Sequence, residues 1–154
     1  MKNQIVRQFS ATIAATVIVF TSGVRTAFGQ QTRASSRSMY EAGLNMRARL
    51  KSEGYDLISL KDVPYYHRFM RGYTTQTVYV DIPKTGRYIL LVGGDNDTQD
   101  LDIKLHGIGS DLSRANTGFI VFNVYKPGRL YYDIKMLGCK APNCGIFAVL
   151  LSTK

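Results

Sequence analysis

The sequence has no tryptophan, two cysteines, two histidines and four prolines in 154 residues. Two cysteines are too few for a small scaffold held together by several disulfides. A zinc site takes about four ligands, and the two histidines lie far apart in the sequence with no metal-binding spacing. The chain also has no Gly-x-Ser-x-Gly segment and no phosphate-binding glycine-rich loop. It does have 45% hydrophobic residues and ten tyrosines, which suits one packed domain.

The first 29 residues have the order of a secretory signal peptide. Lys2 and Arg7 precede the apolar run ATIAATVIVF, and small residues follow as far as Gly29. The run holds about ten residues, whereas a membrane-spanning helix needs roughly 20. We therefore expect cleavage near Gly29, a mature chain that begins at Gln30, and a periplasmic or secreted protein with no stable membrane anchor.

The chain is basic, with 20 Lys and Arg against 11 Asp and Glu and a formal charge of +9. Residues 1–29 carry three basic and no acidic residues, so their removal lowers the charge from +9 to +6. This charge attracts anionic partners over long range, although it also fits a role in solubility alone. Scattered basic residues and predicted export argue against nucleic acid. We expect a monomer whose partner is an envelope protein or an anionic glycan.

Both cysteines lie in the segment GCKAPNCG, as Cys139 and Cys144. Four residues separate them, and in an oxidising compartment this spacing suits a disulfide that closes a turn. A redox-active pair more often has the spacing Cys-x-x-Cys. The sequence therefore predicts a structural disulfide between Cys139 and Cys144.

The predicted mature chain divides into three parts. Residues 30–37 are small and polar and predict a flexible leader. Residues 38–65 predict a helix and its connection, with Ser36 or Ser38 as N-cap and Gly54 at the end. Apolar residues recur at steps of three and four and predict the packing face: Met39, Tyr40, Gly43, Leu44, Met46 and Leu50. Polar residues predict the opposite face: Glu41, Asn45, Arg49 and Glu53.

From residue 66 to residue 154 the pattern alternates, as in an all-β sandwich or barrel. Seven strands are predicted, near residues 66–72, 76–82, 87–93, 100–106, 118–125, 129–137 and 145–151. Side chains in a strand alternate between two faces. The core set is Val78, Val80, Ile82, Leu130, Tyr132, Ile134 and Met136. Tyr79 and Tyr131 are expected to face away from the core.

The segment GGDNDTQDLDIKL gathers four carboxylates, those of Asp95, Asp97, Asp100 and Asp102. Bound Ca²⁺ would relieve their mutual repulsion. The loop is not an EF-hand, since its sixth residue is Asp100 where Gly is required and its twelfth is His106 where an acid belongs. Two interpretations stay open, a calcium site and a solvated, turn-capping acidic loop, of which we favour the second. No other cofactor is expected.

No arrangement of residues predicts an enzyme. A glycosidase needs two carboxyl groups on either side of a cleft, and neighbouring loop positions do not predict one. The alternative that stays open is a small envelope hydrolase, or an accessory subunit of one, that uses the acidic loop. The tyrosines point to binding instead, because exposed amphipathic rings often contact sugars or proteins. The candidate binding face holds Tyr79, Tyr131 and Phe119. The competing interpretation, which we favour, is that the N-terminal helix covers this face.

Residues from about 76 to 151 resemble the pre-peptidase C-terminal-like domains of exported bacterial proteins, and stand-alone periplasmic members most closely. Four segments carry this resemblance: VDIPKTGRYILLVGG, GDNDTQDLDIKLHG, YKPGRLYYDIKM and CKAPNCGIFAVLL. It implies an all-β, jelly-roll-like sandwich of about seven to eight strands, with one short N-terminal helix. It also implies a binding or accessory role without catalysis, and calcium ligands, where present, in the acidic loop. Because the sequence contains no catalytic domain, we expect this role to act on a separate partner.

Overall fold

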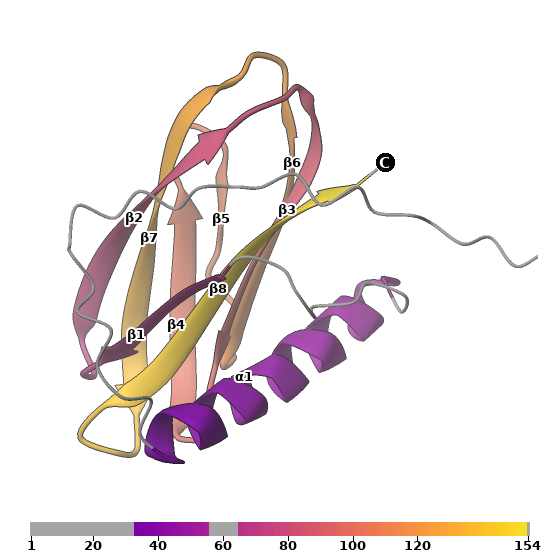
Figure 1. Cartoon of the computed structure of the whole chain (residues 1–154). Coiled ribbons are helices and arrows are strands. Elements are labelled where there is room, and N and C mark those ends of the chain that lie inside the picture. Colours follow the sequence, from indigo (N-terminus) through magenta and orange to yellow (C-terminus); the bar gives the residue numbers. More distant parts are fainter. Residues whose placement is uncertain (1–32, 56–64, 154) are drawn as a thin grey trace, which may run out of the picture.

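The structure is a computed structural model that describes residues 33–55 and 65–153 (Figure 1). The predicted signal peptide lies outside the described residues. Within the described part, one helix precedes eight strands. No helix in this part is long and apolar enough to span a membrane. The elements are α1 (Arg33–Ser52), β1 (Tyr65–Met70), β2 (Thr74–Ile82), β3 (Gly86–Gly94), β4 (Thr98–Leu105), β5 (Gly109–Asp111), β6 (Thr117–Val124), β7 (Gly128–Cys139) and β8 (Cys144–Thr153).

The strands form two antiparallel sheets of four strands each. The first sheet has the order β1-β8-β3-β6 and the second the order β2-β7-β4-β5. This is the strand order of an eight-stranded jelly roll, so the predicted fold class is confirmed. The seven predicted strands are present with small shifts at their ends. The eighth, β5, is only three residues long, too short to show an alternating pattern.

The main core lies between the two sheets and follows the predicted alternation. Val78, Val80 and Ile82 are buried on β2, and Tyr132 and Ile134 are buried on β7. β2 pairs with β7 in one uninterrupted register from Thr74 to Ile82. Because side chains alternate, this register also fixes which residues stand together on the outer face.

Helix α1 covers the outer face of the first sheet, beside β8 and β3 (Figure 1). Its buried residues follow a four-residue step: Ser38, Ala42, Met46 and Leu50. The packing face predicted from sequence is therefore partly wrong, because Tyr40 is 68% and Leu44 46% exposed. Small side chains at Ser38 and Ala42 bring the helix closer to the sheet than bulky ones would. The face predicted to be polar also makes contacts: Asn45 Nδ2 donates to the Gly94 carbonyl at 2.8 Å, and Arg49 to Asp111 Oδ2 at 3.2 Å.

The helix begins at Arg33, so residues 33–37 of the predicted leader are helical. Ser36 and Ser38, the two expected N-cap residues, both lie inside the helix, and the Ser38 hydroxyl donates to the Asp95 carboxylate of the sandwich. Ser38 therefore makes a tertiary hydrogen bond and does not cap the helix. A local sequence pattern cannot predict a bond to a residue so distant in the sequence. The end is as predicted, since Gly54 follows the helix with a left-handed φ of 82°.

Candidate binding surface

Three aromatic rings stand side by side across the outer face of the second sheet. Tyr79 on β2 is the register partner of Tyr131 on β7, with ring centroids 5.8 Å apart. His106 follows β4, donates its backbone N–H to the Tyr131 carbonyl at 3.2 Å, and stacks on the Tyr131 ring at 4.2 Å. We call Tyr79, Tyr131 and His106 the aromatic row. Tyr79 is 47% and Tyr131 44% exposed, so part of each ring is open to a ligand.

Charged residues border the aromatic row on both sides. On one side Arg129 makes two hydrogen bonds to the Asp81 carboxylate, at 2.8 and 3.2 Å. On the other, the Asp133 carboxylate accepts from Thr77 Oγ1 at 2.6 Å and lies 2.7 Å from His106 Nε2. Paired in this way, the charged groups hold fixed orientations beside the rings.

The Asp133 carboxyl stays ionised through its contacts. Burial raises its pKa, but the hydrogen bonds from Thr77 and His106 and the charges of His106 and Lys104 outweigh burial and hold the pKa below its ordinary value. Asp133 is therefore a permanent acceptor beside the row at neutral pH.

Phe119 is not part of this face. It lies on β6 of the first sheet, 5.8 Å from the Tyr55 ring and with the Arg49 guanidinium 5.9 Å from its centroid. The two sheets of the sandwich turn their outer faces in opposite directions, so the helix covers Phe119 and leaves the tyrosines open. The prediction that Phe119 accompanies Tyr79 and Tyr131 is wrong, as is the interpretation that the helix covers the tyrosines. Alternation shows which residues of a strand face the core and which face outward, but it does not show to which sheet the strand belongs.

The four aspartates of the acidic loop have different surroundings and do not form one cluster. Asp95 is only 6% exposed, and its carboxylate accepts from Ser38 Oγ, from the Gly145 amide at 2.7 Å and from Thr98 Oγ1 at 3.2 Å. Asp97 is exposed. Within residues 33–55 and 65–153, no three His, Cys, Asp or Glu side chains are arranged to hold a metal ion. Through these hydrogen bonds, Asp95 links the helix to the sandwich.

Asp100 and Asp102 are partly exposed, on β4. Burial, together with the nearby charge of Asp100, raises the pKa of Asp102. The predicted alternation of these two residues with buried Leu101 and Ile103 is confirmed. Asp102 has Lys135 as its register partner on β7, which places an opposite charge across from it.

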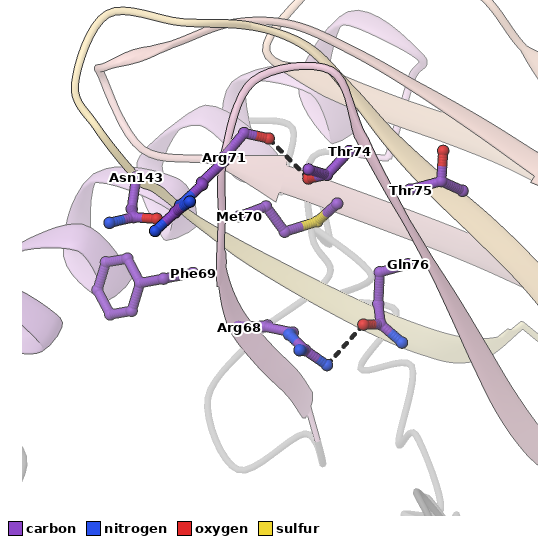
Figure 2. A pocket seen from close by; sticks show the side chains of 8 residues that line it. All are labelled: Arg68, Phe69, Met70, Arg71, Thr74, Thr75, Gln76 and Asn143. Carbon is purple, nitrogen blue, oxygen red and sulfur yellow. Dashed lines mark hydrogen bonds between the residues drawn. The ribbon is translucent and has the colours of Figure 1, made fainter.

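The predicted disulfide is present between Cys139 and Cys144, with a Cα–Cα distance of 5.9 Å. It closes the loop between β7 and β8. Beside this loop, at the turn between β1 and β2, lies a pocket of about 250 Å³ (Figure 2). Its lining is Arg68, Phe69, Met70, Arg71, Thr74, Thr75, Gln76 and Asn143. Sequence reasoning missed this pocket, because the turn and the disulfide loop are about 70 residues apart.

His67 on β1 is packed between aromatic rings. Its ring stacks on Phe147 at 4.3 Å and meets the edge of Phe69 at 5.2 Å. Nε2 is buried and has no hydrogen-bond partner among the described residues. Burial lowers the pKa of His67, against the smaller opposing effect of the Asp95 charge.

We expect this histidine to make folding sensitive to pH. Because its folded pKa lies below the ordinary value of 6.5, the unfolded chain takes up the proton first as the pH falls. Its contribution to stability is complete above about pH 6.5 and is lost as the pH falls toward the folded pKa. His67→Phe keeps a stacked ring that cannot be protonated. Urea unfolding should therefore show a weaker loss of stability between about pH 7 and pH 5 in His67→Phe than in the parent. An equal or steeper loss in the variant would contradict this account of His67.

No family model and no curated protein matches the sequence. Among solved structures, the chain is similar to the crystal structure of the pre-peptidase C-terminal domain of collagenase from Bacillus anthracis, with 12% sequence identity and a TM-score of 0.45. The match covers 57% of this chain and 88% of the collagenase domain. The collagenase domain belongs to the family that the four segments quoted above resemble.

Proposed function

We propose that this protein is an exported, non-catalytic binding module that holds a glycan on the aromatic row. The observation that carries the proposal is the row itself: Tyr79, Tyr131 and His106 stand on three adjacent positions of one sheet face, and no described helix covers them. Rings that are half exposed retain apolar area that a ligand can cover. The signal-peptide pattern and the disulfide between Cys139 and Cys144 support a site of action outside the cytosol.

The charges beside the row favour a glycan over a protein partner. The central part of a protein interface is depleted in Asp, Glu and Lys, whereas here Asp81 and Asp133 directly border the rings. A sugar ring suits this mixture, because its C–H faces stack on aromatic rings while its hydroxyls bond to charged groups at the edge. The basic charge of the chain as a whole favours an anionic glycan, because it attracts anions over long range.

The hydrolase alternative finds less support. His106 and Asp133 form a histidine–carboxylate pair, which is the base and orienting half of a hydrolytic triad. In the described part of the chain no hydroxyl or thiol is hydrogen-bonded to His106, and both cysteines are in the disulfide. The Asp95 carboxylate is bonded to Ser38 and to the Gly145 amide, so it is not free to act as a catalytic acid or base. We infer that His106 serves as a ligand-contacting ring.

Affinity electrophoresis against neutral and acidic polysaccharides, followed by calorimetric titration with the best oligosaccharide, tests the proposal. Tyr131→Ala removes the central ring and should weaken binding by about tenfold or more, because a central aromatic contact contributes on the order of 2 kcal/mol. Tyr79→Ala should have a smaller effect in the same direction.

The matched control is Tyr125→Ala. Tyr125 is 86% exposed, lies between β6 and β7 and is not one of the three rings of the row, so its removal should change affinity by less than about twofold. Equal losses in Tyr125→Ala and Tyr131→Ala, or no retention by any polysaccharide, would refute the proposed function.

A further inference from the structure

The pocket between β1 and β2 has an unusual balance of charge. We call its eight lining residues, given above, the basic pocket. Two of them are arginines, Arg68 and Arg71, and none is Asp, Glu or His. Figure 2 shows the Arg68 guanidinium directed toward Gln76 and that of Arg71 extended toward Asn143. The pocket thus joins two cations to the neutral polar groups of a turn and a loop.

The charges of Arg68 and Arg71 are not compensated by an acidic group among the described residues. Arg68 Nη1 donates to Gln76 Oε1 at 2.6 Å, and Arg68 also hydrogen-bonds to the Tyr66 hydroxyl. Both acceptors are neutral. Within residues 33–55 and 65–153, neither Arg68 nor Arg71 takes part in an ion pair. An arginine held in place by a neutral acceptor keeps its full charge and its remaining N–H donors for a ligand.

The walls of the basic pocket are held in place. In the turn, Thr74 Oγ1 donates to the Arg71 carbonyl at 2.7 Å. Tyr73 has a left-handed φ of 60°, and its amide donates to the Met136 carbonyl at 2.7 Å. On the other side, the disulfide closes the loop that carries Asn143. A fixed site loses less entropy when a ligand binds than a mobile one does.

We propose that the basic pocket binds a phosphate or sulfate group. Guanidinium groups match the geometry of such oxyanions through paired hydrogen bonds, and the Asn143 amide adds a neutral donor. The volume of about 250 Å³ lies below the roughly 300–1,000 Å³ of pockets for drug-sized ligands, so the pocket suits one anionic group and not a large molecule. This site is separate from the aromatic row and does not depend on the glycan proposal.

The test is a titration of the ¹⁵N-labelled domain with inorganic phosphate and with inorganic sulfate at constant ionic strength, followed by ¹H–¹⁵N NMR. We expect saturable shifts concentrated at residues 68–76 and at Asn143. Arg71→Ala should weaken binding by about tenfold, since a hydrogen bond to a charged group contributes about 1.5–3 kcal/mol. Removal of both Arg68 and Arg71 should abolish saturation.

Arg87→Ala is the matched control, because it removes one exposed arginine that does not line the pocket. It should change the affinity by less than about twofold. Tyr131→Ala should leave phosphate binding unchanged, which separates this site from the aromatic row. Chemical shifts that do not saturate would overturn the proposal. An equal loss of affinity in Arg71→Ala and Arg87→Ala would overturn it as well.

A second arm identifies the source of the anionic group. Glucose 6-phosphate and glucose are titrated in parallel, and only the phosphate ester should shift residues 68–76. Tighter binding of glucose 6-phosphate than of inorganic phosphate would support an esterified ligand, and the reverse order would support a free ion. Equal shifts with glucose and with glucose 6-phosphate would contradict an anion site.

Discussion

Replacement of Asp95 by alanine is expected to lower the free energy of unfolding by about 3 kcal/mol, because it leaves several buried donors without an acceptor. The Asp95 carboxylate receives Ser38 Oγ from the helix, the Gly145 amide from β8 and Thr98 Oγ1 from β4. An unsatisfied buried donor costs about 1–3 kcal/mol. The loss should appear as a lower midpoint in urea unfolding, together with weaker hydrogen-exchange protection in α1.

Asp97→Ala is the control for this prediction. Asp97 is exposed and lies in the same acidic loop, so its removal should change stability by no more than about 0.5 kcal/mol. The comparison also tests the calcium interpretation of the loop. A calcium site would give a rise in the melting temperature with Ca²⁺ that Asp97→Ala abolishes. Equal stability losses in the two variants would contradict the role given to Asp95.

Glycine-to-alanine substitution should change stability in opposite directions at two positions, one beneath the helix and one within it. Gly93 on β3 lies under α1, where an added Cβ would be 2.9 Å from Met46 Sδ and 3.0 Å from the Ala42 carbonyl oxygen. The helix would have to move away, and overpacking of this kind costs about 1–3 kcal/mol. Gly43 is within the helix, and a Cβ there would meet nothing within 4 Å. Gly43→Ala should stabilise the protein by up to about 1 kcal/mol, because alanine favours the helix more than glycine does.

Urea unfolding of both variants against the parent measures this difference in sign. The double variant should lie close to the sum of the two effects if the helix stays in place. Gly93→Ala with unchanged stability would show that α1 does not pack as closely on β3 as described. Destabilisation by Gly43→Ala would show that residue 43 is not in a regular helix.

Much of the fold follows from local pattern. Alternation located the core residues of β2 and β7. The turns that contain Pro83 and Pro127 located strand ends but not hairpins, because each joins strands of different sheets, β2 to β3 and β6 to β7. The end of the helix at Gly54 also followed, because a left-handed residue there favours glycine. The helix start did not follow, because Ser38 bonds to Asp95, which is 57 residues away. The buried face of the helix did not follow from the pattern either, because it depends on how closely the helix packs against Gly93.

The candidate site was only partly predictable. Tyr79 and Tyr131 were expected to face away from the core because each alternates with buried neighbours, but the helix was expected to cover them. His106 was missed as the third ring, because its place beside Tyr131 depends on the pairing of β4 with β7. Phe119 was misplaced for a related reason, since alternation does not say to which sheet a strand belongs. The basic pocket depends on Asn143 meeting the β1–β2 turn, and no local pattern encodes that contact.

The most direct measurement is an NMR map of the surface that the best-binding oligosaccharide covers. The account predicts that the shifted amides belong to β2, β7 and the end of β4, centred on Tyr131, and that the Tyr79 and Tyr131 ring signals shift with them. It also predicts that the amides of α1 stay unchanged, since the helix covers the opposite face of the sandwich. Shifts centred on α1 or on the acidic loop, with the aromatic row unaffected, would contradict it.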